Sequence, residues 1–306
     1  MINKKRISKL ILLYVGIYML SILAACAGRR QNNLLPGSES ADSESNNNQT
    51  NLKEEYNMQE LSLHKGDMKI YGQIYLPGNG TEQYPTVIIG HGFGGSYSDN
   101  IQNAKELAQA GYACYIFDFC GGSPYSSSDG SMLDMSVMTE AEDMEAVLEQ
   151  MEEQSFVDQQ NIFLMGESQG GLVAALTASE HMSEIKGLIL YYPAFVIPDN
   201  TRAQYRTIDE IPDTATIFGM KVGKKYHSDV FHLDVYASIS AFTKDVLIVH
   251  GDRDGIVPIS YSERAVDAYD SAKLITIQGA GHGFNGEEAE LAMQSMISYI
   301  AEHTID

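Results

Sequence analysis

Three groups of polar side chains occur where a nucleophile, a base and an acid could act together. Ser168 lies in GESQG (166–170), a match to G-x-S-x-G between a short apolar run and a helical pattern. Two carboxylates, Asp252 and Asp254, follow a second apolar run, and His282 follows a third. A serine hydroxyl needs a base to remove its proton and an acid to orient that base. These residue types in this order predict nucleophilic catalysis by Ser168, with His282 as the base.

The position of Ser168 between a strand pattern and a helix pattern favours a catalytic role. A sharp strand-to-helix turn strains the backbone of the nucleophile, and flanking glycines remove Cβ atoms that would clash. The helix N-terminus offers backbone N–H groups to a developing oxyanion. A serine that only caps the helix is the alternative, and the downstream acid and histidine favour catalysis. Cys120 is a second possible nucleophile, although no histidine follows it in a supporting arrangement.

The segments that carry these residues alternate between strand and helix patterns. Continuously apolar runs rich in β-branched and aromatic residues suit strands buried on both faces of a parallel sheet. Such runs cover residues 86–90, 113–119, 161–166, 187–192, 246–251 and 273–279. Helical patterns cover residues 100–111, 138–152, 169–181, 260–270 and 286–303. The alternation predicts an α/β protein with a doubly wound sheet, and residues 60–65 and 68–76 predict an opening antiparallel hairpin.

One segment, residues 193–236, interrupts this alternation and is too long for an ordinary loop. Long insertions in compact domains are usually functional, so we expect a cap over one end of the sheet. Aromatic residues of the cap either line an apolar or aromatic acyl pocket or only pack the cap onto the sheet. These residues are Phe195, Tyr205, Phe218, Tyr226 and Phe231. Their enrichment alone leaves both interpretations open.

Residues of about 58–306 resemble the α/β-hydrolases of the serine aminopeptidase-like and cinnamoyl (feruloyl) esterase-like group. The matching segments are HGFGGSYSDN (91–100), FDFCGGSPYSSSDG (117–130), GESQGG (166–171), HGDRDGIVPISYSE (250–263) and GAGHGF (279–284). The chain order of serine, acid and histidine is also that of this family. The resemblance implies the α/β-hydrolase fold, with a mostly parallel central sheet flanked by helices and a cap over its carboxyl end. Segment 117–130 departs from the family's Asp-x-x-Gly-x-Gly-x-Ser turn, which leaves the shape of the pocket open.

The resemblance also implies roles for individual residues. In the family the acid is the last residue of H-G-x-x-D, which is Asp254 in this sequence. Asp252 is the alternative candidate for the acid. If Asp254 is the acid, we expect Asp252 to be a turn carboxylate that accepts hydrogen bonds from local N–H groups. The oxyanion hole would consist of the backbone N–H groups of Phe93 and Gln169.

Two further histidines are expected to be structural. His91 precedes the acid in the chain and opens a glycine-rich turn, so we expect its imidazole to hold that loop. His250 ends a buried strand, and we expect a satisfied core group. No metal-ligand spacing is formed by His64, His181, His227, His232 or His303. We therefore expect neither a metal nor a cofactor.

The leading hypothesis is a serine hydrolase that cleaves a small-molecule carboxylic ester through an acyl-enzyme. Aryl and short-chain acyl esters are the candidates. A serine peptidase with the same triad is the alternative, because the resemblance includes aminopeptidase-like members. A lipoprotein that binds a ligand without turnover is a third hypothesis, which the intact set of three residues disfavours. The net charge of −21 makes nucleic acid a poor partner.

The N-terminal segment predicts a location outside the cytoplasm. A basic opening precedes an uncharged apolar run at residues 10–25, which is short for the ~20 residues of a bilayer span and suits a secretory signal. Its end, Leu-Ala-Ala-Cys26, resembles the lipobox of bacterial lipoprotein signal peptides. The resemblance implies removal of residues 1–25 and acylation of Cys26, which would anchor the protein in a membrane of the cell envelope. An uncleaved, tilted membrane anchor is the alternative.

The segment after Cys26 predicts a linker before the folded domain and not a domain of its own. Residues 26–56 are rich in Ser, Asn and Glu and contain few large apolar side chains. Such a segment cannot bury enough surface to offset its ordering entropy, so we expect a flexible tether. Residues 57–306 are then the α/β-hydrolase domain, including the cap.

Overall fold

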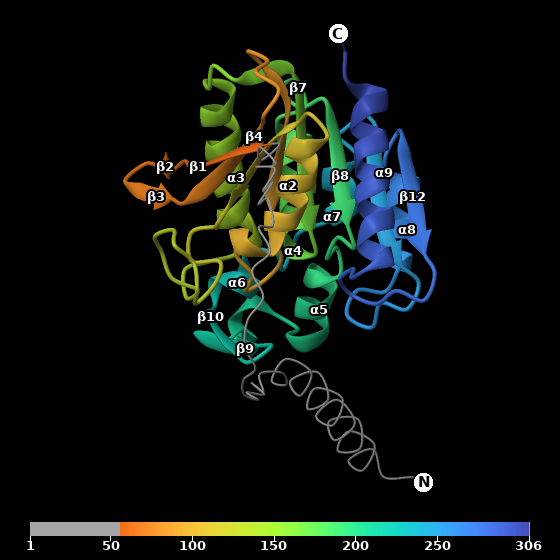
Figure 1. Ribbon diagram of the computed structural model, residues 1–306. Coiled ribbons are helices and arrows are strands. Elements are labelled where there is room, and N and C mark those ends of the chain that lie inside the picture. Colours follow the sequence, from red (N-terminus) through yellow and green to blue (C-terminus); the bar gives the residue numbers. More distant parts are fainter. Residues whose placement is uncertain (1–55, 306) are drawn as a thin grey trace, which may run out of the picture. The chain divides into compact units, whose positions relative to one another are not determined.

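The computed structural model describes residues 56–305, and these residues form an eight-stranded sheet (Figure 1). Its strand order is β1-β4-β6-β5-β7-β8-β11-β12. The bounds are Tyr56–Glu60 for β1, Gly72–Pro77 for β4, Tyr84–Gly90 for β5, Ala113–Phe117 for β6, Val157–Glu167 for β7, Gly187–Tyr191 for β8, Val246–Gly251 for β11 and Ala272–Ile277 for β12. β4 is antiparallel to both neighbours, and the other pairings are parallel. The apolar runs of the sequence thus form the parallel strands, as predicted.

Helices cover both faces of this sheet (Figure 1). One face carries α3 (Val137–Glu152), α4 (Gln169–Glu180), α7 (Val235–Ile239) and α8 (Ser260–Ala268), and the other carries α2 (Ile101–Gln109) and α9 (Glu287–His303). Successive strand residues point to opposite faces, so Ile88 of β5 packs in one core while Val87 and Ile89 pack in the other. The predicted α/β-hydrolase architecture is confirmed.

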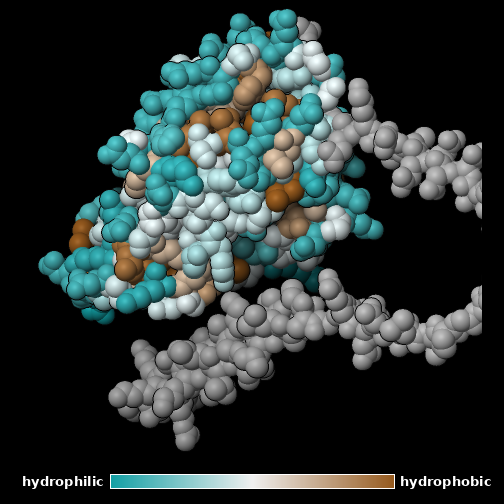
Figure 2. Space-filling model, turned by 60° about the vertical axis from the view of Figure 1, so that its left-hand side comes forward, coloured by the Kyte–Doolittle hydropathy of each residue, from teal (hydrophilic) through white to brown (hydrophobic). Residues whose placement is uncertain are grey.

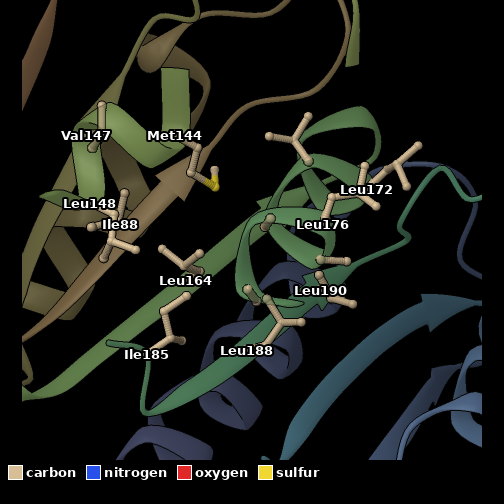
Figure 3. Packing of buried hydrophobic residues seen from close by; sticks show 14 of the residues in the cluster. Ile88, Met144, Val147, Leu148, Leu164, Leu172, Leu176, Ile185, Leu188 and Leu190 are labelled. Atoms are coloured by element: carbon tan, nitrogen blue, oxygen red, sulfur yellow. The ribbon is translucent and has the colours of Figure 1, made fainter. Parts of the chain in front are cut away.

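The core beneath α3 and α4 holds the helix that follows the predicted nucleophile. Figure 3 shows Ile88, Leu164 and Leu188 of three adjacent strands in one buried cluster with Met144 of α3 and Leu172 of α4. All five side chains are fully buried. Burying a side chain of this size contributes about 1.5–3 kcal/mol. This packing fixes α4, and with it the residue at its N-terminus, over the sheet.

The opening hairpin is shorter than predicted. β2 (Leu63–Lys65) and β3 (Met68–Ile70) pair antiparallel on either side of a turn that contains Gly66. The φ of Gly66 is +56°, a conformation that glycine adopts without a steric penalty. The turn and the pairing therefore agree with the sequence, but each strand spans three residues.

The predicted second strand over 68–76 is wrong as one continuous strand. After β3 the chain enters the main sheet as β4, beginning at Gly72. A Cβ at Gly72 would lie 2.2 Å from the hydroxyl oxygen of Tyr115, so glycine allows this close approach. β4 pairs with β1, a strand that the sequence analysis did not predict.

Residues 193–236, predicted as a cap, contain several short elements that follow the carboxyl end of β8. They are α5 (Ile197–Gln204), the 3-10 turn η2 (Ile208–Glu210), β9 (Thr214–Ile217), β10 (Met220–Gly223) and α6 (Lys225–Ser228). β9 and β10 form an antiparallel hairpin whose turn contains Phe218 and Gly219, both at positive φ. Figure 1 shows α5, α6 and the hairpin together at one end of the sheet.

Hydrophilic and apolar residues both occur on the surface of the described part of the chain. Figure 2 shows hydrophilic residues over most of one face, with small apolar areas between them. Within residues 56–305, no helix has both the length and the apolar character that a membrane span requires. The predicted signal peptide and Cys26 lie outside the described residues.

Candidate active site

Ser168 occupies the sharp turn between β7 and α4. Its φ of 52° and ψ of −115° are unfavourable for a residue with a side chain and cost about 1–3 kcal/mol. A Cβ at Gly166 would lie 2.1 Å from the carbonyl oxygen of Gly170. A Cβ at Gly170 would lie 2.4 Å from the carbonyl oxygen of Gly90. The two glycines of the G-x-S-x-G pattern are therefore required by the close packing of this turn.

The structure brings Ser168, His282 and Asp254 together in one chain of hydrogen bonds. His282 Nε2 lies 2.9 Å from Ser168 Oγ. His282 Nδ1 lies 2.6 Å from Asp254 Oδ2. A carboxylate only accepts, so Nδ1–H donates to Asp254 and Nε2 is left to accept the serine proton. The three residues follow β7, β12 and β11, and they meet because the carboxyl ends of parallel strands share one edge.

Asp254, and not Asp252, faces His282. The second carboxylate oxygen of Asp254 accepts hydrogen bonds from the backbone N–H groups of Ile256 and Val257, at 2.8 and 2.9 Å. Asp252 is exposed, and its carboxylate accepts from the N–H of Gly279 at 2.6 Å. Asp252 is thus a turn carboxylate, the role expected of it if Asp254 meets the histidine.

The carboxyl of Asp254 is held in its ionised form. Burial alone would raise its pKa, but hydrogen bonds from His250, His282 and the N–H of Val257 outweigh that effect and keep the pKa below its usual range. A permanently ionised acid can orient the imidazole of His282 and stabilise its positive charge.

His250 is more than the satisfied core group that we expected. Its imidazole is fully buried, and Nδ1 lies 2.7 Å from Ser262 Oγ. Nε2 lies 2.9 Å from the Val257 carbonyl and 3.2 Å from Asp254 Oδ2, the oxygen that also contacts His282. Both ring nitrogens of His250 have hydrogen-bond partners, as predicted, but its contact with Asp254 was not predicted. His250 is at the end of β11 and Asp254 is in the loop that follows, and this spacing of four residues gives no periodic signal for such a contact.

The glycine-rich loop after β5 lies directly against the serine. A Cβ at Gly92 would be 3.3 Å from Ser168 Cβ. Among the turn and loop hydrogen bonds of the described residues, neither the Phe93 N–H nor the Gln169 N–H is a donor. Both residues line one cavity together with Ser168. This is the pair that the resemblance implies for an oxyanion hole.

His91 holds this loop, as expected from its place in the chain. Its imidazole is buried, with Nδ1 2.8 Å from the Gly92 carbonyl, and its Nε2 accepts the N–H of Phe119 at 3.3 Å. The carbonyl requires the proton on Nδ1, so both nitrogens are satisfied. Burial lowers the pKa of His91, which keeps it neutral.

A buried polar network behind the serine was not predicted. The side chain of Gln169 donates from Nε2 to Glu140 Oε2 at 2.7 Å and accepts from the hydroxyl of Tyr226 at 2.8 Å. Burial, opposed by this hydrogen bond, raises the pKa of Glu140 to about 8. Tyr226 belongs to α6, so the network connects the cap to α4 and α3. One feature of the sequence could have indicated this network: Glu140 is on the face of α3 that also carries buried apolar residues.

A cavity of about 290 Å³ opens beside Ser168, and most of its walls belong to the cap. Its walls are mostly apolar, with side chains of α5, the β9–β10 hairpin and the loop after β11. Phe218 and Tyr226 line it, as two of the five aromatic residues proposed from the sequence. His227 also lines it and is almost fully buried, with Nδ1 2.9 Å from Thr201 Oγ1 and no partner for Nε2.

The other three aromatic residues do not line this cavity. Phe195 is buried in the core beneath the cap, with its ring 6.2 Å from that of Tyr236. Phe231 is buried, and its carbonyl accepts from Arg202. The ring of Tyr205 lies 5.1 Å from that of His227. The contacts of these three residues fit the packing interpretation.

Cys120 does not have the properties of a nucleophile. Both Cys114 and Cys120 are free and buried. Burial, with the negative charge of Asp143 beside it, raises the pKa of Cys120 to about 12, so its thiolate is scarce at neutral pH. Within the described residues, no group of three or more His, Cys, Asp or Glu side chains is placed to hold a metal ion.

Comparisons with known proteins show that this chain is similar to hydrolases. The family model for serine aminopeptidase, S33, matches residues 81–228, and the model for TAP-like protein matches residues 232–306. Est1E from Butyrivibrio proteoclasticus, in a structure with bound ferulic acid, is 28% identical to this chain with a TM-score of 0.73. The alignment covers 79% of this chain and 98% of Est1E.

Two relatives known from sequence show similar levels of identity. A proline iminopeptidase from Thermoplasma volcanium is 29% identical over 125 residues. That match covers 40% of this chain and 39% of the iminopeptidase, so it spans well under half of that relative. A protein of unknown role from Mycobacterium tuberculosis is 27% identical over 214 residues, which are 69% of this chain and 67% of that protein.

Proposed function

The chain belongs to the α/β-hydrolase superfamily, and on that premise we propose that it is a serine hydrolase that cleaves carboxylic esters. One observation carries the proposal. The hydroxyl of Ser168, on a strained turn, lies 2.9 Å from an imidazole whose other nitrogen is held by a buried carboxylate. A serine with a base and an orienting acid at these distances is the arrangement required for acyl transfer.

The contacts support the following mechanism. Ser168 Oγ attacks the ester carbonyl while His282 Nε2 takes the serine proton, and Asp254 stabilises the resulting imidazolium. The tetrahedral oxyanion accepts hydrogen bonds from the backbone N–H groups of Phe93 and Gln169. His282 then delivers its proton to the leaving alkoxide, which leaves an acyl-enzyme. Water repeats the cycle with His282 as its base and releases the carboxylic acid.

The cavity beside Ser168 supports an aryl or other apolar acyl group. Its volume of about 290 Å³ and its mostly apolar wall suit one aromatic ring with a short linker. The unpartnered Nε2 of His227 would bind a polar substituent on that ring. Est1E, which has ferulic acid bound in its structure, supports a hydroxylated aryl acid. We therefore propose hydroxyaryl acyl esters as the preferred substrates.

A serine peptidase is the second candidate, supported by the aminopeptidase family model and the iminopeptidase relative. An aminopeptidase must bind the free α-ammonium group of its substrate, and a carboxylate would normally do so. None of the described residues that line the cavity is Asp or Glu. We therefore rank ester hydrolysis first.

The test combines labelling with a substrate comparison. A fluorophosphonate probe should label the full-length protein, and Ser168→Ala should remove the label. Acyl nitrophenyl esters should be hydrolysed faster than aminoacyl anilides, and methyl ferulate faster than methyl cinnamate. His227→Phe should reduce the preference for ferulate without abolishing hydrolysis. Labelling that survives Ser168→Ala would refute the nucleophile, and faster turnover of the anilides would favour the peptidase.

We further propose that the protein acts at a membrane of the cell envelope. The support is in the sequence alone: a basic opening, a short apolar run and a cysteine in a lipobox-like context at Cys26. Two or more acyl chains on one protein give stable anchoring, whereas a single chain is marginal.

A further inference from the structure

A second cavity, of about 510 Å³, lies on the face of the sheet that α2 and α9 cover. Its walls come from α2, the start of α9, the ends of β7 and β8, and the loop 283–286 that follows His282. It shares no lining residue with the cavity beside Ser168. It is therefore a separate site that touches the back of the histidine loop.

All the charged side chains that line this cavity are acidic. Four carboxylates line it, those of Asp99, Glu106, Glu167 and Glu290, and no lining residue is Lys, Arg or His. Burial, together with the negative charge of Asp99, raises the pKa of Glu167 to about 7. Carboxylates that line one cavity repel each other, and a bound cation offsets that repulsion.

A buried hydroxyl in the wall also lacks a partner. Tyr191 is 3% exposed, lines the cavity, and its hydroxyl makes no hydrogen bond with the described residues. A buried polar group that stays unpaired costs about 1–3 kcal/mol. Burial, with the negative charges of Glu167 and Glu106, raises the pKa of Tyr191, so the hydroxyl stays protonated and points to a ligand that supplies the missing partner.

Aromatic rings determine which kind of cation fits. The ring of Phe284 lies 5.6 Å from that of Tyr191 and 4.9 Å from that of Tyr192, and all three residues line the cavity. Aromatic faces beside carboxylates bind alkylammonium groups through cation–π attraction. The described residues form no metal-binding group, since no three ligating side chains converge. A metal ion is therefore the poorer occupant.

We propose that this cavity binds an organic ammonium group, held by Glu167 and its neighbouring carboxylates and by the aromatic rings of Tyr191, Tyr192 and Phe284. The ring of Tyr192 lies 4.7 Å from that of His282, so the bound cation sits behind the catalytic loop and outside the acyl cavity. The ligand is thus a second ligand and not the acyl group of the substrate. The inference does not depend on the proposed hydrolase activity.

Calorimetric titration of the full-length protein tests the proposal directly. Choline and cadaverine present a quaternary and a primary ammonium group, and the control ligand is the uncharged analogue of choline in which carbon replaces nitrogen. At constant ionic strength we expect saturable binding of at least one cation and none of the uncharged analogue. Ser168→Ala should bind as the wild type does, which separates this site from catalysis.

Matched variants locate the site. Glu167→Gln and Phe284→Leu should each weaken the cation at least about tenfold, which corresponds to the ~1.4 kcal/mol that one such contact contributes. Glu302→Gln removes the same charge from an exposed position near the far end of α9 and should leave affinity within about twofold. Tyr191→Phe should weaken binding without lowering the stability of the free protein, because the lost hydroxyl has no protein partner.

Three results would overturn the proposal. The first is no saturable binding of either cation at millimolar concentration. The second is equal binding of choline and its uncharged analogue, which would indicate a merely apolar cavity. The third is equal affinity of wild type, Glu167→Gln and Tyr191→Phe, which would place any bound cation elsewhere.

Discussion

The imidazole of His250 contacts the same carboxylate oxygen of Asp254 that His282 does, with its Nε2 3.2 Å from Asp254 Oδ2. The carbonyl of Val257, 2.9 Å from Nε2, can only accept, so this nitrogen carries the proton. The hydroxyl of Ser262 then donates to Nδ1. His250 is a positioning residue that supports the acid without touching the substrate.

His250→Ala should lower kcat more than it raises KM. A hydrogen bond to a charged group contributes about 1.5–3 kcal/mol, so the loss of kcat should be roughly 10- to 100-fold. His250→Gln, which keeps a donor near the carboxylate, should recover part of the activity. Steady-state kinetics with a nitrophenyl ester measure the split. A fall in stability with unchanged kcat would assign His250 a purely structural role.

Because Ser168 has a strained conformation, we expect its replacement by glycine to abolish almost all activity but to cost less stability than its replacement by alanine. Ser168→Ala and Ser168→Gly should both reduce turnover by several orders of magnitude, leaving a residual rate from the oxyanion hole and binding. Glycine tolerates a φ of 52° where alanine does not. Ser168→Gly should therefore be more stable than Ser168→Ala by about 1 kcal/mol in urea unfolding. Equal stabilities would argue that this turn stores no strain.

Asp254→Asn and Asp252→Asn form a matched pair on one loop. Asn at 254 preserves shape but supports the wrong imidazole tautomer, and the corresponding change in a serine protease lowers turnover by about 10⁴-fold. Asp252 accepts the N–H of Gly279 and lies away from His282, so its replacement should change activity far less. Kinetics on both purified variants rank the two carboxylates. A reversed ranking would assign the acid to Asp252.

The sequence predicts well those features that repeat along the chain. Apolar runs and helical periodicity locate the parallel strands and their helices, because burial on both faces of a sheet imposes a local pattern. The residues at strand ends, Ser168, Asp254 and His282, follow from the same pattern together with their chain order. Tyr56–Glu60 was missed because an exposed edge strand has no such apolar pattern.

Contacts that depend on three-dimensional packing were not predictable from the pattern. The Gln169 side chain reaches Glu140 and Tyr226, which are 29 and 57 positions away in the chain. Sorting the cap aromatics also required the fold, because Phe195 and Phe218 belong to one segment yet are 1% and 60% exposed. Short irregular elements carry no periodicity that indicates their buried side.

Cys26→Ser should abolish membrane anchoring if the lipoprotein proposal is correct. Without the thiol the precursor cannot be acylated, so it should stay unprocessed or be released from the membrane. Fractionation and metabolic labelling with a fatty acid measure both effects, and Cys120→Ser is a control because that thiol is buried in the folded domain. Processed, membrane-bound Cys26→Ser protein would show that another segment forms the anchor.

Glu140 should make the stability of the protein depend on pH. Its pKa in the folded protein is about 8, well above the ~4.3 of an unfolded chain. Between these values the native carboxyl holds a proton that the unfolded chain has released. The free energy of unfolding should therefore fall as pH rises through this window, by up to about 1.4 kcal/mol per pH unit.

Glu140→Gln tests this dependence, because its amide can still accept from Gln169 but cannot ionise. Urea unfolding at several pH values between 5 and 8 should show a shallower loss of stability for the variant than for the wild type. Glu149→Gln, an exposed change on the same helix α3, should keep the wild-type slope. Parallel pH profiles for the wild type and Glu140→Gln would mean that Glu140 is already ionised beneath the active site. The network behind Ser168 would then contain a buried charge, where we infer a neutral acid that ionises only above neutral pH.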